Sequence, residues 1–227
     1  MNAKKIVPLT MCFVLALMPI VMVNAMQKSC ENGSVVTEGF TSKDKRDKDD
    51  ILLVNYQYPL PSTYKPNLIE LANKEKVDES IYPSLQAMFD DARSYGLNLK
   101  VNSGYRSYEE QIAIMDIYIQ DYINQGMSED VARAEATKWV AQPGYSEHET
   151  GLAVDIGPGD GCISSRMLYT WLARNAHNYG FILRYPQSKK SITHVEGEQW
   201  HFRYVGKKAA TQIYKEGICL EEYLGKV

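Results

Sequence analysis

A carboxylate lies within an apolar strand near the middle of this chain. Residues 152–156 read Leu-Ala-Val-Asp-Ile, and they follow a loop that begins with Gly144 and carries His148. A short apolar run after such a loop predicts a buried strand. An ionised carboxylate without a partner is expensive in that environment. The fold must therefore bring a partner to Asp155, and a metal ion would remove this cost.

Short helices and strands follow one another in irregular order around this segment. Apolar residues three and four apart, glycine stops, and a capping box of Ser107 and Glu110 indicate the helix boundaries. We expect helices over residues 83–96, 107–126, 128–140, 168–180 and 207–216, and strands over 97–101, 152–156, 181–183 and 200–205. This order favours an α+β domain, in which helices flank a small antiparallel sheet.

Length and charge narrow the class of protein. The 227 residues suffice for one domain that needs neither disulfides nor metal to fold. Hydrophobic residues at 44% and charged residues at 23% exclude disordered and fibrous classes for most of the chain. The net charge of -3 argues against a nucleic-acid partner. We expect a monomer whose folded domain spans residues 51–227.

The first 25 residues predict an export signal. Two lysines precede an uncharged apolar run over residues 6–23, and small residues end at Ala25. An uncleaved membrane anchor is the alternative, since this run is at the lower limit for spanning a bilayer. Polar residues 26–50 then form a solvated tether. In both cases the domain works outside the cytoplasmic membrane.

Export permits disulfides, and three cysteines lie beyond the signal: Cys30, Cys162 and Cys219. Cys30 lies in the polar tether, so we expect Cys162 to pair with Cys219. Three unpaired thiols are the alternative.

Two segments carry the residue types of a catalytic zinc site. The first holds His148 and Asp155, and the second, some forty residues later, holds Glu198 and His201. Catalytic zinc commonly takes three imidazole or carboxylate ligands and leaves a fourth position for water, whose pKa falls to about 7. We predict that His148, Asp155 and His201 bind one Zn²⁺. Taken singly, each histidine would be read as an ordinary loop or strand residue.

Glu198 and Arg106 complete this prediction. A carboxylate beside the metal would act as general base, which indicates metal-assisted hydrolysis, most simply of an amide. Arg106 follows a strand and precedes the capped helix, so its guanidinium would face an anionic substrate or a developing oxyanion. A surface arginine is the alternative.

Five further residues are weaker candidates for contact with the substrate or the cleft wall: Gln111, Ser146, Tyr145, Trp200 and Tyr204. Core packing would explain the aromatic ones equally well. We predict that the remaining histidines, His177 and His194, do not bind metal.

Three motifs together resemble the zinc D-alanyl-D-alanine carboxypeptidases of the VanY type, a group related to lysostaphin-like peptidases and the hedgehog domain. The motifs are SGYRSYEEQ (103–111), SEHETGLAVDIG (146–157) and EQWHFRYVG (198–206). The resemblance covers about residues 51–225. It implies that His148, Asp155 and His201 are zinc ligands and that Glu198 is the general base.

The resemblance also matches Arg106 and Gln111 to the family's substrate-binding arginine and the glutamine that follows it. Two residues depart from the usual pattern. Relatives often have proline where this chain has Gln199, and glycine where it has His194. Both departures concern substrate preference more than catalysis.

The implied substrate is the D-Ala-D-Ala end of a peptidoglycan stem peptide, with release of the terminal D-alanine. Removing this residue from wall precursors would deprive vancomycin of its target, and ordinary wall remodelling fits equally well. Alternatives within the superfamily are an L,D-carboxypeptidase and a peptidoglycan endopeptidase. An alternative of another class is a zinc-containing module that binds wall peptides without cutting them.

Overall fold

The computed structural model of the chain describes residues 48–162 and 164–227. The predicted export signal, Cys30 and most of the predicted tether lie outside these residues. The last three tether residues form a short 3-10 helix, η2 (Lys48–Asp50). Within the described part of the chain, no helix combines the length and apolar character needed to cross a membrane.

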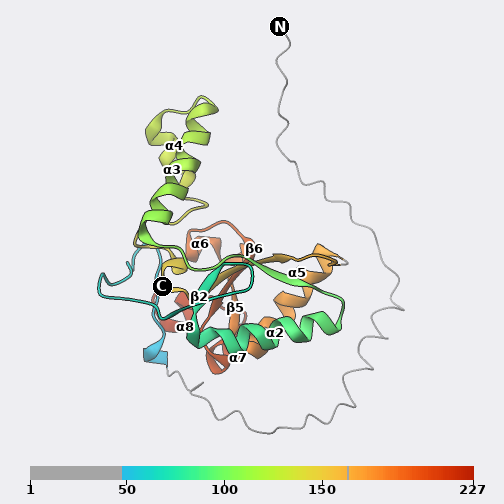
Figure 1. Cartoon of the computed structure of the whole chain (residues 1–227). Coiled ribbons are helices and arrows are strands. Elements are labelled where there is room, and N and C mark those ends of the chain that lie inside the picture. Colours follow the sequence, from blue (N-terminus) through green and yellow to red (C-terminus); the bar gives the residue numbers. More distant parts are fainter. Residues whose placement is uncertain (1–47, 163) are drawn as a thin grey trace. The chain divides into compact units, whose positions relative to one another are not determined.

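A four-stranded antiparallel sheet carries the domain and confirms the predicted α+β class (Figure 1). Its order is β3 (Leu99–Ser103), β4 (Ala153–Pro158), β6 (Glu198–Tyr204) and β5 (Phe181–Tyr185). Strands β4 and β6 are therefore central and carry the two predicted site segments. A separate hairpin of β1 (Leu68–Glu70) and β2 (Lys76–Asp78) was not predicted.

The helices largely follow the predicted boundaries. They are α2 (Tyr82–Ser94), α3 (Tyr108–Asn124), α4 (Glu129–Ala136), α5 (Ser165–Asn175), α6 (Lys190–Thr193), α7 (Lys207–Glu216) and α8 (Leu220–Leu224). Short 3-10 helices are η3 (Glu79–Ile81), η4 (Glu147–Thr150), η5 (Ala176–Tyr179) and η6 (Gln187–Lys189). The predicted capping box of Ser107 and Glu110 begins α3. By contrast, α4 ends before Val140, and the helix predicted up to Gly180 divides into α5 and η5.

Three apolar clusters stabilise this arrangement. The largest joins the sheet to α2 and α5 through residues such as Val154, Phe202, Met88 and Leu168. A second joins Ile51 and Leu53 to Ile182, α7 and α8. The third lies within the pair α3 and α4, which stands away from the sheet in Figure 1. The sheet and its first two clusters therefore form the rigid support of the site.

Two expectations are corrected here. Tyr204 does not line the cleft, because its ring is buried in the main core with its centroid 5.1 Å from that of Phe181. The expected disulfide is wrong, since Cys162 and Cys219 are both free thiols. Cys162 packs against the main core, whereas Cys219 precedes α8, whose residues belong to the second cluster. The two cysteines therefore lie beside different clusters.

Candidate metal centre and active site

The register of the central strands brings two of the predicted ligands together. Asp155 on β4 is the direct antiparallel partner of His201 on β6. Side chains at paired positions extend from the same face of a sheet and contact each other. Accordingly, Oδ1 of Asp155 lies 3.3 Å from Nδ1 of His201.

His148 reaches the same place from η4, the 3-10 helix just before β4. Gly151 ends this helix in the left-handed conformation (φ 70°), and a Cβ there would lie 2.9 Å from the backbone nitrogen of Asp78. Nδ1 of His148 lies 2.7 Å from the carbonyl oxygen of Gly104. Because a carbonyl only accepts, Nδ1 donates and the lone pair is on Nε2, 3.4 Å from Oδ1 of Asp155.

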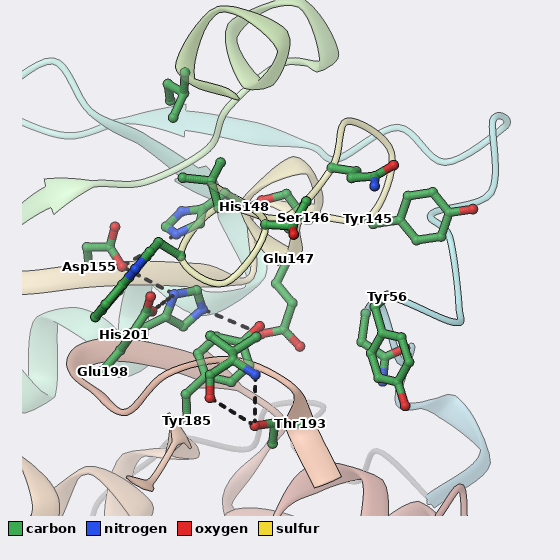
Figure 2. A pocket seen from close by; sticks show the side chains of 18 of the residues that line it. Tyr56, Tyr145, Ser146, Glu147, His148, Asp155, Tyr185, Thr193, Glu198 and His201 are labelled. Atoms are coloured by element: carbon green, nitrogen blue, oxygen red, sulfur yellow. Dashed lines mark hydrogen bonds and ion pairs between the residues drawn. The ribbon is translucent and has the colours of Figure 1, made fainter. Parts of the chain in front are cut away.

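These three side chains fit a zinc ion. One ligand atom from each lies within 4.8 Å of the others, and Figure 2 shows the rings and the carboxylate converging. Nε2 of His148 and Oδ1 of Asp155 are buried and have no hydrogen-bond partner. A tetrahedral ion with bonds of about 2.0–2.1 Å holds its ligand atoms about 3.3–3.4 Å apart. The separations from Oδ1 of Asp155 match this value.

The electrostatics of the cluster also favour a cation. Burial alone would lower the pKa of His201, but the carboxylates of Asp155, Glu147 and Glu198 outweigh it and raise this pKa well above its usual range. Burial would raise the pKa of Asp155, but His148 and His201 hold it below its usual range. Three carboxylates thus surround one buried imidazole, and a divalent ion would neutralise their charge.

Glu198 lies where the predicted general base should be. Its carboxylate is nearly buried and lines the cleft, with Oε2 3.4 Å from Nδ1 of His201. The side chain is therefore beside the ligand cluster and faces the space that a substrate would occupy.

Arg106 follows β3, lines the same cleft as Glu198 and is held by three neighbours. Its Nε donates to Oγ of Ser103 (3.0 Å), Nη1 to Oε1 of Gln111 (3.2 Å) and Nη2 to Oδ2 of Asp155 (3.1 Å). Gln111 is fully buried and donates to the carbonyl of Ala141 at 2.7 Å. The structure thus places Gln111 behind Arg106, as its support, instead of at the substrate as predicted.

A cleft of about 410 Å³ opens beside the cluster. Tyr145 and Trp200, predicted for the cleft wall, and Ser146, predicted to contact the substrate, all line it. The lining residues that the sequence did not predict include Tyr56, Glu147, Tyr185 and His194. His194 is outside the ligand cluster, and its ring meets that of Tyr56 at a centroid distance of 4.5 Å.

The sequence contains no pattern that identifies these residues as part of the cleft. For Glu147 the one available signal, its position in the sequence between Ser146 and His148, is weak. Tyr56 comes from the segment before the sheet and meets the cleft only through tertiary packing.

The fold and the site together define a class. An antiparallel sheet that presents a His-Asp-His cluster, with a glutamate beside it and an arginine at the same cleft, is the arrangement of a hydrolase with a single catalytic metal ion.

Comparisons with known proteins identify the family. The family model of VanY, described as D-alanyl-D-alanine carboxypeptidase, matches residues 74–207. A D-alanyl-D-alanine carboxypeptidase of Enterococcus faecalis is 48% identical over 187 residues, covering 81% of this chain and 69% of the relative. The chain belongs to the VanY family of D-alanyl-D-alanine carboxypeptidases.

Two solved structures agree with this result, each 48% identical to the chain. A variant of the vancomycin-resistance D,D-pentapeptidase VanY in complex with Zn(II) has a TM-score of 0.74, covering 76% of this chain and 97% of that one. VanYB in complex with D-alanine-D-alanine has a TM-score of 0.75, covering 77% and 96%. The predicted enzyme class is confirmed: the protein is a zinc D-alanyl-D-alanine carboxypeptidase.

Proposed function

We propose that this enzyme removes the terminal D-alanine from peptidoglycan stem pentapeptides that end in D-Ala-D-Ala. The observation that carries the proposal is the placement of Arg106 and Glu198 at one cleft, where Arg106 contacts the ligand Asp155 and Glu198 contacts the ligand His201. A substrate with a free terminal carboxylate suits a cleft with a fixed guanidinium. The D-alanine-D-alanine bound by VanYB supports the same substrate end.

Each side chain has a distinct task in this reaction. His148, Asp155 and His201 would hold the zinc, which supplies a Lewis acid for the scissile carbonyl and the attacking water. Glu198 takes a proton from the water and later delivers it to the departing amine of D-alanine. Arg106, fixed by Ser103, Gln111 and Asp155, offers its remaining N–H groups to negative charge on the substrate.

The cellular role follows from the substrate and the predicted export signal. Peptidoglycan stems lie outside the cytoplasmic membrane, so we propose an extracytoplasmic enzyme, secreted or associated with the cell envelope. Loss of the terminal D-alanine from wall precursors would weaken vancomycin binding. This supports a role in glycopeptide resistance, and wall remodelling would use the same reaction.

Product analysis by mass spectrometry tests the proposal. The zinc-loaded protein, its metal content checked first, is incubated with a pentapeptide stem ending in D-Ala-D-Ala and with the tetrapeptide ending in one D-alanine. We expect loss of a single D-alanine from the pentapeptide, cessation with a chelator and recovery with zinc. Cleavage of the tetrapeptide instead would indicate an L,D-carboxypeptidase, and cleavage inside the stem an endopeptidase. An intact pentapeptide would refute the proposal.

A further inference from the structure

Glu147 is a buried carboxylate to which the mechanism above gives no task. It lies in η4 between Ser146 and His148, and its side chain is fully buried. Its Oε1 atom lies 2.8 Å from Nε of Arg184 and 3.1 Å from Nη1 of Arg203. These two arginines fix one oxygen of the carboxylate and leave the other, Oε2, without a hydrogen-bond partner.

The free oxygen of Glu147 faces the metal ligand His201. Oε2 lies 3.6 Å from Nε2 of His201, which is also buried and without a hydrogen-bond partner (Figure 2). The other ring nitrogen, Nδ1, faces Asp155 in the ligand cluster. An imidazole that directs Nε2–H at a carboxylate keeps its Nδ1 lone pair for a metal. The two unpartnered atoms therefore complement each other, and a small shift would bring them into hydrogen-bond range.

Arg203 contacts the segment of residues 51–55 directly, and Arg184 contacts it through Glu221. Nη2 of Arg203 donates to the carbonyl of Leu52 at 2.8 Å. Arg184 binds both oxygens of Glu221, at 2.9 and 2.6 Å, and Oε1 of Glu221 accepts from Nδ2 of Asn55 at 2.9 Å. Two independent routes thus connect this segment to the carboxylate of Glu147 beside His201.

The arginines of this network are fully buried, which suggests a role for it other than stabilising the fold. Arg184 is 0% exposed and Arg203 1% exposed. Taking such charges out of water costs about as much as their pairing returns, so a buried ion network is a weak source of stability. Two buried side-chain atoms of the network have no hydrogen-bond partner: Nη1 of Arg203, which forms only the ion pair with Oε1 of Glu147, and Oε2 of Glu147. Oε2 faces His201, and a role in orienting that ring accounts for it.

We propose that Glu147 is the positioning residue for the zinc ligand His201, and that Arg184 and Arg203 couple this carboxylate to the docking of residues 51–55. Carboxylate partners of metal-bound imidazoles fix the ring and its tautomer. Docking of the segment therefore contributes to zinc affinity from a distance. The inference concerns metal binding in the absence of substrate, so it does not depend on which peptide bond the enzyme cuts.

Chelator competition on the purified full-length protein tests the first part. We expect Glu147→Gln to weaken zinc binding by about 10–100-fold, because a neutral amide replaces the acceptor of Nε2–H. Glu147→Asp keeps the charge that the arginines need but shortens the reach toward His201, so it should fold and show a smaller loss. Unchanged zinc affinity in both variants would overturn the role of Glu147.

A control variant that is destabilised about as much as Glu147→Gln, but outside the network, distinguishes an effect on the position of His201 from a general loss of stability. Leu172→Ala opens a cavity in the main core, where Leu172 is fully buried and has no part in the network. Zinc affinity, measured well below the melting temperature of either variant, should remain near the parent value in Leu172→Ala. An equal loss of affinity in Leu172→Ala and Glu147→Gln would assign the effect to stability and refute positioning.

Asn55→Ala tests the coupling to the segment. It removes the amide that binds Glu221 and leaves every residue next to the metal in place, so we expect a loss of zinc affinity smaller than that of Glu147→Gln. The matched control is Asn73→Ala, which removes a comparable amide hydrogen bond, 2.7 Å to the carbonyl of Val101, outside the network. If both asparagine variants bind zinc alike, the proposed coupling is wrong.

Discussion

Oε2 of Glu198 lies 3.4 Å from Nδ1 of His201, although the two residues are three apart on one strand. In a regular strand, residues three apart point to opposite faces. Strand β6 is irregular at this point, since Leu183 of β5 pairs with Phe202 but Tyr185 pairs with Glu198. Two steps along β5 thus correspond to four along β6, and at such a bulge the regular alternation of faces does not hold.

Glu198→Gln should separate metal binding from catalysis. The amide cannot accept the proton of the attacking water, so we expect turnover to fall by about a hundredfold or more with full zinc content. D-Alanine release and elemental analysis on the same sample measure the two quantities. The control is Glu196→Gln, two residues earlier, because Glu196 pairs with Lys190 away from the cleft. Near-normal turnover in Glu198→Gln would place the general base elsewhere.

His201→Ala should lose the metal itself. Two of the three ligand atoms remain in this variant, and a site with two protein ligands holds zinc much more weakly than one with three. His177→Ala provides a histidine control, since the ring of His177 stacks on Tyr214 at 3.8 Å and is outside the cluster. A stoichiometric zinc content in His201→Ala after dialysis would remove His201 from the ligand set.

The metal centre could be predicted from the sequence because few other roles explain its combination of residue types. The aspartate in the strand at 152–156 required a partner, two histidines completed a set of three zinc ligands with it, and a glutamate near the second histidine supplied the general base. The sheet register then brought Asp155 opposite His201, which no pattern in the sequence specifies. The helices of residues 82–94 and 108–124 were predictable for a simpler reason, their apolar period and their caps.

The features that escaped prediction depend on tertiary contacts. The strands of the hairpin of β1 and β2 are only three residues long. Its turn holds Lys74 at a φ of 74°, a conformation that glycine usually adopts, so the usual sequence sign of a turn is absent. The burial of Glu147 in η4 depends on ion pairs with Arg184 on β5 and Arg203 on β6. Gln111 shows a different difficulty, because local pattern placed it near the substrate while packing turned its amide toward Ala141.

Arg106→Lys should lower kcat/KM by about 10²–10³ while zinc remains bound. Three neighbours hold the guanidinium by separate N–H groups, and a lysine ammonium cannot reproduce this planar geometry. Gln111→Ala should cause a smaller loss, because Ser103 and Asp155 still hold the arginine. Arg93→Lys on α2, where the side chain forms an exposed pair with Asp90, is the control for the substitution itself. Equal kinetics in Arg106→Lys and Arg93→Lys would exclude a role for Arg106 in the reaction.

Thiol labelling should distinguish the two described cysteines. Burial raises the pKa of the Cys219 thiol to about 11, so at pH 8 only about one molecule in a thousand carries the reactive thiolate there. Cys162 is partly exposed at the edge of the main core. We therefore expect iodoacetamide to modify Cys162 in the native protein and Cys219 only after denaturation, as read by peptide mass mapping. The same map, prepared without reductant, should contain no peptide that links Cys162 to Cys219, and such a peptide would contradict the free thiols of these two residues in the described part of the chain.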